Sequence, residues 1–235
     1  MKLTVFIACF NEKSTILKTI QLAKQLNIDK EIMVIDNCST DGTREILKGL
    51  ENDKTLRIIL HSRNMGSGYS ACECVKLAQG DYLYGPGADL EYKMDDVYKM
   101  IDKIEKEDLD AVFGSRLSDR KNVSKAALIK ERPYWLGSII ATFLINLFYC
   151  REFTDIIATK LMKINLLKGL NLEAHNQAFE FELVSKLCKK GYKIGEVPVW
   201  YKPRTHKEGK TMRAIDMVPA ILAILKVKFW LRENA

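Results

Sequence analysis

The sequence has few of the residues that mark several common protein classes. Its 235 residues include only 13 glycines, 5 prolines and 3 histidines. The low glycine and proline content excludes a collagen-like or low-complexity chain. A chain that is 47% hydrophobic and 29% charged can bury a core, which excludes a disordered protein. The length fits one large domain or a domain with an appendage.

The cysteines form no metal or redox motif. They are Cys9, Cys38, Cys72, Cys74, Cys150 and Cys188. None belongs to a C-x-x-C pair, so a zinc site of the usual spacing is excluded. The N-terminus has no signal-peptide layout, because its short apolar run has the pattern of a strand. We therefore expect reduced thiols in a cytoplasmic protein.

Long apolar runs are also missing. No stretch reaches the roughly 18–20 apolar residues of a membrane-spanning helix. The nearest is 134–150, where Ser138, Thr142 and Asn146 recur every four positions and form one polar stripe on a predicted helix. A second apolar helix is predicted over 212–232. These helices could lie in a membrane interface, cover the sheet or form a dimer contact, and the sequence leaves these alternatives open.

Several nucleotide-binding and catalytic motifs are absent. Gly66-x-Gly68 lacks the third glycine of a dinucleotide fingerprint, and the chain has no Walker lysine motif. These absences exclude a nicotinamide dehydrogenase and a P-loop enzyme. No G-x-S-x-G elbow supports a hydrolase. The three histidines lie far apart and show no metal-ligand spacing.

What is present is an uneven distribution of charge. Residues 1–115 carry 15 basic and 19 acidic side chains, a net charge of −4, whereas residues 116–235 carry 22 basic and 11 acidic side chains, a net charge of +11. The basic half is expected to meet an anion such as a phosphate, a nucleic acid or a lipid surface. No recognition helix or RNP-type aromatic motif supports nucleic acid, so we expect no nucleic-acid partner.

Short apolar runs alternate with helical patterns through the first 115 residues. Strands are predicted over 2–9, 31–36, 57–60, 82–84 and 110–114. This alternation is typical of an α/β fold with a parallel sheet covered on both faces, where ligands bind at the carboxyl ends of the strands. The alternation breaks after Arg116. The second half is predicted to contain a basic linker over 116–132, helices over 134–150, 176–190 and 212–232, and a strand over 194–200.

Polar residues follow two of the predicted strands. Asp36 and Asn37 can bind ribose hydroxyls and the edge of a base, or they can cap their own turn. Asp89 and Glu91 can share one Mg²⁺ or Mn²⁺ with a diphosphate, or they can be solvated loop acids. Basic residues of the second half can bind phosphate or simply face solvent. These are Arg132, Lys202, Arg204, Lys207, Lys210 and Arg213.

Four motifs stand in order at the predicted strand ends: FNE, DNCSTDGT, GADLE and GSR. This set resembles the inverting glycosyltransferases of family 2, in the branch similar to polyprenyl-phosphate mannose or glucose synthases, where the usual forms are YNE, DDGSTDGT, DADL and GSR. The segment 179–204 resembles the acceptor side of the same branch. The resemblance spans about residues 1–213. It implies the GT-A fold in one continuous domain, with a donor half at 1–115, an acceptor-side half at 116–235 and peripheral apolar helices.

The resemblance implies transfer of a hexose, with inversion, from a UDP- or GDP-linked sugar to a polyprenyl phosphate or a glycan intermediate. It further suggests Mg²⁺ or Mn²⁺ as cofactor and a peripheral place on the cytoplasmic membrane face, with a homodimer as an open alternative. Gly87 stands where the family's DxD motif has its first Asp, which keeps a non-catalytic nucleotide-sugar binding homologue as the competing interpretation. Asn37 replaces the second Asp of the DDGS pattern and leaves the base undetermined.

The resemblance also implies roles for single residues. The residues expected at the nucleotide sugar are Ala8, Phe10, Glu12, Asp36, Asn37, Ala88 and Asp89. Those expected to take part in catalysis are Asp89, Arg116, Glu180 and Glu182. Those expected at phosphate or at the acceptor are Arg132, Arg204 and Lys210. Asp89 would be the metal carboxylate with Glu91 beside it, and Glu180 or Glu182 would be the base if the acceptor is a hydroxyl.

Overall fold

The computed structural model describes residues 1–118, 135–176, 178–204 and 217–230. The strands are β1 (Leu3–Cys9), β2 (Lys30–Asp36), β3 (Leu56–Leu60), β4 (Tyr82–Tyr84), β5 (Ala111–Ser115), β6 (Lys160–Lys163) and β7 (Ile194–Pro198). The helices are α1 (Ile16–Gln25), α2 (Thr43–Lys48), α3 (Ser67–Leu77), α4 (Asp96–Lys106), α6 (Trp135–Tyr149), α7 (Ile164–Lys168), α8 (Phe179–Lys189) and α9 (Met217–Leu225), which continues as the π-helical turn η4 (Lys226–Trp230).

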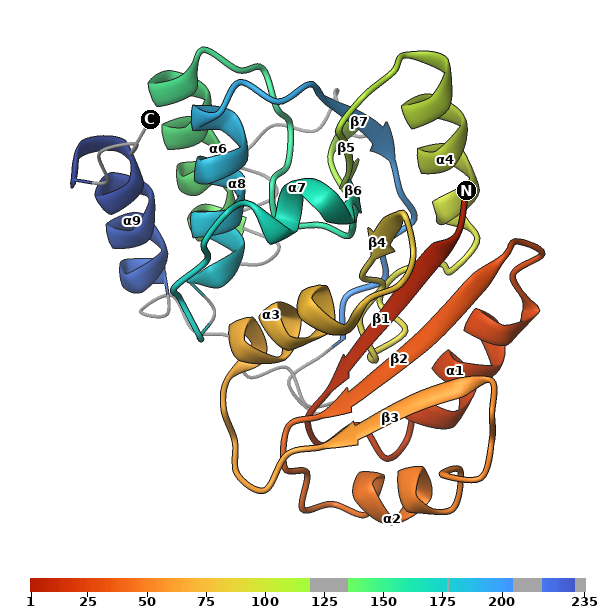
Figure 1. Ribbon diagram of the computed structural model, residues 1–235. Coiled ribbons are helices and arrows are strands. Elements are labelled where there is room, and N and C mark those ends of the chain that lie inside the picture. Colours follow the sequence, from red (N-terminus) through yellow and green to blue (C-terminus); the bar gives the residue numbers. More distant parts are fainter. Residues whose placement is uncertain (119–134, 177, 205–216, 231–235) are drawn as a thin grey trace.

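The strands form one seven-stranded sheet in the order β3-β2-β1-β4-β6-β5-β7 (Figure 1). The predicted α/β class and its mostly parallel sheet are confirmed, because β1 to β4 pair in parallel and β5 pairs in parallel with β7. The exception is β6, which runs antiparallel to both β4 and β5.

The predicted break in alternation after Arg116 is wrong. β6, α7 and β7 continue the sheet, and β6 lies between β4 and β5, so both halves of the chain build it. β6 was not predicted, because its four residues, KLMK, include two lysines and show no apolar alternation. Lys160 is buried there nonetheless, which is possible only because a carboxylate pairs with it.

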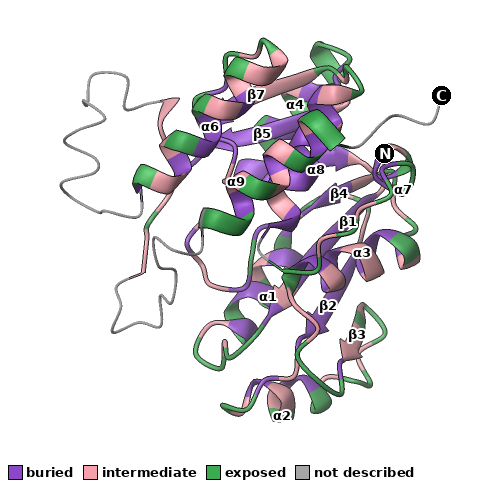
Figure 2. Ribbon diagram, turned by 90° about the vertical axis from the view of Figure 1, so that its left-hand side faces the viewer, coloured by how far each residue is buried: buried purple, intermediate pink, exposed green. Residues whose placement is uncertain are grey.

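Two apolar cores lie on the two faces of the sheet. Leu3, Val5 and Ile7 of β1 point to the face covered by α1, α2 and α4, whereas Phe6 and Ala8 point to the face covered by α3, α6, α7, α8 and α9. This alternation is the period of two that a strand imposes on its side chains. The buried residues in Figure 2 follow the strands through the middle of the molecule.

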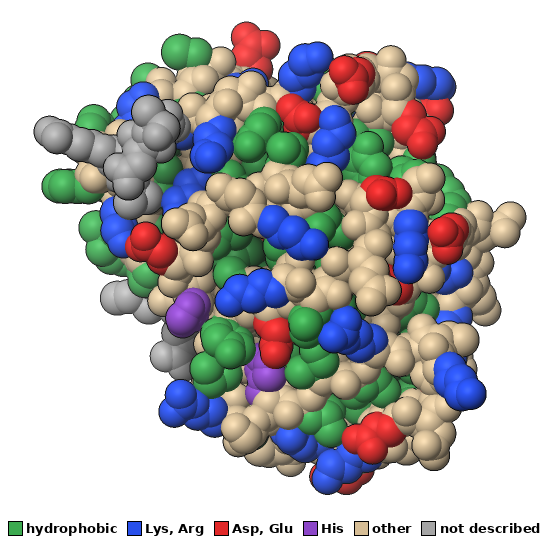
Figure 3. Space-filling view, in the orientation of Figure 1, with side chains coloured by type: hydrophobic (Ala, Val, Ile, Leu, Met, Phe, Trp, Pro, Cys, Tyr) green, Lys and Arg blue, Asp and Glu red, His purple; other side chains and the backbone are tan. Residues whose placement is uncertain are grey.

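Among the described helices, none is long and apolar enough to cross a bilayer. The charged side chains are mixed on the face shown in Figure 3, where Lys and Arg lie among Asp and Glu. The excess of positive charge therefore does not form a single patch on that face.

Candidate active site

The loop after β4 places Asp89 at the carboxyl end of the sheet. Gly87 has a φ of +79°, a left-handed conformation that glycine adopts freely and other residues adopt at a cost. A Cβ at this position would lie 3.2 Å from Asp89 Oδ1. The missing first Asp of the family motif thus coincides with a backbone conformation that favours glycine. Burial raises the pKa of Asp89, and the nearby charge of Glu91 raises it further.

Arg204 joins the acidic residues at these strand ends. Its guanidinium donates two hydrogen bonds to Glu12, each 2.9 Å long, and lies 3.4 Å from Asp89 Oδ2. Its backbone N–H donates to Glu91 Oε1 at 2.8 Å. Burial alone would lower the pKa of Arg204, but its hydrogen bonds to Glu12 and the negative charges of Glu12, Asp89 and Glu91 raise it. The structure therefore brings together four of the residues singled out from the sequence, and we call them the Arg204 cluster: Glu12, Asp89, Glu91 and Arg204.

The donor set at this cluster fits a divalent cation only with help from the substrate. Within the described ranges, no three His, Cys, Asp or Glu side chains are arranged to hold a metal by themselves. Mg²⁺ and Mn²⁺ are commonly held by one or two carboxylates together with substrate phosphates and water. Asp89, with Glu91 two residues on, meets that requirement. The Arg204 guanidinium, 3.4 Å from Asp89, partly neutralises the negative charge of that carboxylate.

Asp36 and Asn37 follow β2 and hold the neighbouring loops. Asp36 is fully buried, accepts from the Ser39 N–H and pairs with Arg44 at 3.3 Å. Asn37 Oδ1 accepts from the Met65 N–H at 2.8 Å. Asp36 thus caps its own turn through the Ser39 N–H, whereas Asn37 bonds the loop after β3. The predicted contacts of both residues with a nucleoside stay predictions.

Asn37 belongs to a network that the sequence did not indicate. His61 Nδ1 lies 3.2 Å from Asn37 Oδ1, and His61 Nε2 lies 2.6 Å from Glu73 Oε2 on α3. Asn37 Nδ2 donates to Asn64 Oδ1 at 2.8 Å. The network fixes the loop after β3 against the end of β2. It could not be predicted, because its residues lie 12 to 27 positions apart in the sequence.

The remaining residues expected at the nucleotide lie around the same edge. Ala8 is half-buried near the end of β1, and Phe10 just beyond it is exposed. Ala88 is buried, and its carbonyl oxygen accepts from the Thr19 hydroxyl at 3.0 Å. The exposed Phe10 ring is free of the core and is available to a planar ligand.

Arg116 is held within the protein rather than in the Arg204 cluster. Its guanidinium makes a two-point ion pair with the buried Asp155, at 2.5 and 2.9 Å. It also donates to Ser138 Oγ at 3.1 Å and lies against the ring of Trp135 at 4.5 Å. Burial would raise the pKa of Asp155, but Arg116 holds it below its ordinary value. The expected catalytic role of Arg116 stays a prediction, and Arg132 and Lys210 lie outside the described residues.

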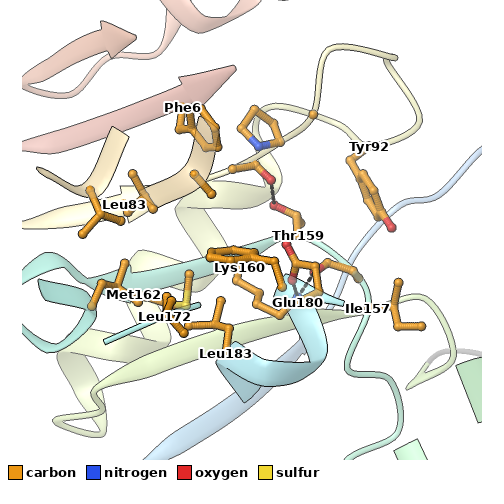
Figure 4. Close-up of a pocket in the computed structure, with 18 of the residues that line it drawn as sticks. Phe6, Leu83, Tyr92, Ile157, Thr159, Lys160, Met162, Leu172, Glu180 and Leu183 are labelled. Carbon is orange, nitrogen blue, oxygen red and sulfur yellow. Dashed lines mark hydrogen bonds and ion pairs between the residues drawn. The ribbon is translucent and has the colours of Figure 1, made fainter. Parts of the chain in front are cut away.

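A cavity of about 180 Å³ opens beside the loop that carries Asp89 (Figure 4). Gly85, Gly87 and Asp89 line one side, and Lys160 and Glu180 lie on another. The rest of its wall is mostly apolar and includes Phe6, Leu83, Met162, Leu172 and Leu183. Thr159 donates to the Gly85 carbonyl at 2.9 Å and ties β6 to the loop. The cavity therefore adjoins the residues expected to bind the donor sugar.

The structure separates the two candidate bases. Glu180 lies in the first turn of α8 and lines the cavity, with a half-exposed side chain that Lys160 contacts at 2.6 Å. Glu182 is buried and accepts from the backbone N–H groups of Glu173 and Ala174 at 3.0 and 2.7 Å. Two residues along a helix point to different sides. Of the two, Glu180 is the one that lines the cavity.

Comparison with known proteins agrees with this arrangement. The family described as glycosyl transferase family 2 matches residues 4–170. A low-salt glycan biosynthesis hexosyltransferase, Agl6 of Haloferax volcanii, is 25% identical over 206 residues, which are 86% of this chain and 48% of that protein. Glycosyltransferase AglJ of the same organism is 27% identical over 83% of this chain and 61% of its own length. The chain thus spans about half to three-fifths of these relatives.

Solved structures give the same fold. A glucosyl-3-phosphoglycerate synthase from Mycobacterium tuberculosis, in complex with Mn²⁺, uridine-diphosphate and glucosyl-3-phosphoglycerate, superposes with a TM-score of 0.67 at 17% identity, over 99% of this chain and 81% of that one. TarS of S. aureus, residues 1–349, superposes with a TM-score of 0.62 at 16% identity, over 100% of this chain and 74% of that one. The mixed sheet and its helices therefore have the GT-A fold.

Proposed function

The chain belongs to glycosyl transferase family 2, and on that premise we propose that it transfers a hexose from a nucleotide diphosphate sugar to an acceptor, with inversion at the anomeric carbon. The donor would bind at the carboxyl ends of β1, β2 and β4. The acceptor would be a lipid-linked one, either a polyprenyl phosphate or a glycan intermediate. UDP and GDP are the two nucleotides to test first, and UDP is the one bound in the glucosyl-3-phosphoglycerate synthase complex.

The observation that carries this proposal is the place of the Arg204 cluster beside the cavity. Asp89 belongs to both, because it contacts Arg204 at 3.4 Å and lines the cavity together with Glu180. A donor whose diphosphate lies at Asp89 would have its sugar directed to the cavity and to Glu180. This is the order of groups that an inverting transfer needs, because the leaving group and the attacking group lie on opposite sides of the anomeric carbon.

The chemistry follows from charge. Mg²⁺ or Mn²⁺ held through Asp89 would neutralise the diphosphate as it leaves. Arg204 would add a fixed positive charge at the same place, and pre-placed charge of this kind is usually the largest catalytic contribution. Glu12 holds the Arg204 guanidinium at two points and so sets its orientation.

The competing function is binding of a nucleotide sugar without turnover. It is favoured by Gly87, which removes one acid of the family motif. It is also favoured by the Arg204 guanidinium, which already lies against the carboxylates that a metal would use. This alternative predicts donor binding with neither transfer nor donor hydrolysis.

A ligand screen followed by a transfer assay separates these functions. Thermal unfolding is recorded with UDP, GDP and CDP and with their sugars, each with and without Mn²⁺, because a ligand of the native state raises its melting temperature. The hexose donor that raises it most is then used for transfer. Asp89→Ala should abolish transfer, whereas Asp102→Ala, which removes an exposed acid on α4, should not. Equal transfer by the Asp89 variant would contradict the role of Asp89.

We propose further that an apolar face of α6 and α9 rests on an anionic membrane surface. The polar stripe of α6 points inward, where Ser138 contacts Arg116 and Asn146 bonds the backbone of Phe153. The opposite side of α6 carries exposed apolar residues, and α6 contacts α9, which with η4 carries more of them. Figure 2 shows exposed segments along α6 and α9. The exposed residues are Leu136, Ile140, Phe143, Leu147, Val218, Leu222, Phe229 and Trp230.

The residues around this face support a membrane surface as its partner. Lys189 and Lys228 donate to the backbone carbonyls of Val227 on η4 and Phe148 on α6, so their positive charge lies next to this face, where it would attract anionic headgroups, whereas Lys226 is paired with Glu173. Trp230 is 73% exposed at the end of η4, and tryptophan is enriched at membrane–water interfaces. A homodimer across this face is the outcome that would replace the proposal.

A further inference from the structure

Lys160 and Glu180 form an ion pair in which one partner is buried and the other reaches the cavity. The Lys160 side chain is 4% exposed and the Glu180 side chain 45%. Lys160 Nζ donates to Glu180 Oε2 at 2.6 Å and to the Ala158 carbonyl at 3.0 Å. Figure 4 shows both side chains at the same wall of the cavity. The buried ammonium therefore determines where the carboxylate lies.

The sheet itself does not need a lysine at this position. Lys160 lies over the ring of Phe113 at 5.4 Å, in surroundings that an apolar side chain would also fill. Burying an ammonium is costly unless it is paired, so the lysine is stable there only with its carboxylate. The N-terminal turn of α8 also favours a negative charge at Glu180. The ion pair with Lys160 therefore fixes the Glu180 carboxylate at the wall of the cavity.

We propose that Lys160 is a positioning residue for Glu180, and that the acceptor group is a neutral sugar hydroxyl rather than a phosphate. This inference rests on the hexosyl transfer proposed above and specifies its acceptor. Glu180 Oε2 is used by Lys160, which leaves Oε1 to accept a proton. Glu180 lines the cavity, and a carboxylate that takes up a proton is needed by a hydroxyl acceptor but not by a phosphate, whose oxygen is already ionised near neutral pH. The apolar wall suits the carbon face of a sugar ring.

The step balances without another reactant. The acceptor hydroxyl oxygen forms a bond to the anomeric carbon while its proton moves to Glu180 Oε1. The bond between that carbon and the diphosphate oxygen breaks, and the electron pair leaves with the nucleoside diphosphate. The products are an inverted glycoside, a nucleoside diphosphate and a protonated Glu180, which returns its proton to water.

The acceptor class is tested with two acceptors that carry the same alkyl chain, an alkyl glycoside and an alkyl phosphate. We expect transfer to the glycoside to be at least about 100-fold faster. Glu180→Gln should lower that transfer by about 10² to 10⁴-fold, with the affinity for the donor within about threefold of the parent. Preferential transfer to the alkyl phosphate, or full activity of Glu180→Gln, would overturn the inference.

The role of Lys160 is tested by Lys160→Met, which keeps the length of the side chain, and by Lys160→Arg, which keeps the charge. Lys160→Met should lower kcat by at least tenfold with an unchanged KM for the donor, and Lys160→Arg should recover part of the loss. Thermal unfolding shows whether each variant folds. In the Glu180→Gln background, Lys160→Met should cause no further loss, because a positioning residue acts through its partner. An independent loss in that background would contradict the role.

Failure of the acceptor inference can be told from failure of the proposed function. If no nucleotide sugar raises the melting temperature, the proposed function fails. If a donor binds and is hydrolysed slowly without an acceptor, but the glycoside is never modified, the proposed transferase function is retained. The inference of a hydroxyl acceptor is then rejected.

Discussion

Arg204 binds Glu12 through two hydrogen bonds of 2.9 Å, although 192 residues separate them in the chain. The ion pair connects two loops at the carboxyl edge of the sheet, because Glu12 follows β1 and Arg204 follows β7. It also places a guanidinium next to Asp89 and Glu91. A residue from the second half of the sequence therefore reaches the carboxylates of the first half.

Removing the Arg204 charge should change metal binding. Arg204→Gln should bind Mn²⁺ about tenfold more tightly in the absence of nucleotide, a gain of about 1.4 kcal/mol, because the guanidinium no longer competes for Asp89. The same variant should bind a nucleoside diphosphate more weakly, because a phosphate contact is lost. Titration of Mn²⁺ by electron paramagnetic resonance measures the first effect without any turnover. Arg63→Gln, at an exposed arginine, is the matched control, and equal Mn²⁺ affinity in all three proteins would refute competition.

Asp89 should make stability depend on pH in a defined direction. Because its pKa is raised in the folded protein, the folded state binds this proton more tightly than the unfolded state does. Ionisation of Asp89 therefore lowers the free energy of unfolding as the pH rises from the unfolded-state pKa through the raised value. Asp89→Asn should accordingly be more stable than the parent at pH 7.

Urea unfolding at pH 7 and at pH 3 checks this expectation. At pH 3 the carboxyl is largely protonated in both states, so the difference between Asp89→Asn and the parent should shrink. A stability difference that is the same at the two pH values would show that the amide acts through contacts rather than through charge.

The pair of Arg116 and Asp155 should be a large contributor to stability. Asp155→Asn leaves a buried guanidinium without its counter-charge, and breaking a buried pair in this way costs about 3–5 kcal/mol. The pKa of Asp155 is lowered in the fold, so its contribution is present above the unfolded-state pKa and is lost as the pH falls. Chemical denaturation at pH 7 measures the cost. The exposed pair of Asp102 and Lys106 is the control, and Asp102→Asn should cost less than about 1 kcal/mol.

The apolar face of α6 should be required for membrane binding and not for folding. A double variant, Phe143→Glu and Leu147→Glu, should lose flotation with vesicles that contain anionic lipid, and its melting temperature should stay within about 2 °C because both side chains are exposed. Leu17→Glu places the same charge on an exposed leucine of α1 and should still float. Sedimentation of the parent as a dimer that the double variant disrupts, with no vesicle binding, would assign this face to a second copy.

Much of the fold could be predicted because its signals are local. β1 alternates between two cores, and the motifs FNE, DNCSTDGT, GADLE and GSR each lie at or just after the end of a strand, which places them at the same edge of the sheet. The antiparallel β6 could not be predicted, because a buried lysine is stable only with the distant Glu180. The pairing of Arg116 with Asp155 rather than with a ligand was hidden for the same reason: the partner is set by tertiary contacts, not by spacing. Lys160 could have been noticed as a single charge in the run 156–162, which is otherwise uncharged.

Restoring the family motif at position 87 should destabilise the protein rather than activate it. Gly87→Asp must adopt a φ of +79°, and side-chain residues pay about 1–2 kcal/mol in left-handed backbone. The new Cβ would also approach Asp89 Oδ1 to 3.2 Å and place a second negative charge beside it. Gly87→Ala carries the backbone cost without the charge. We therefore expect both variants to lose stability in urea unfolding, with only Gly87→Asp showing a changed pH dependence of Mn²⁺ binding. Higher transfer by Gly87→Asp at unchanged stability would show that the missing acid, and not the backbone, limits this site.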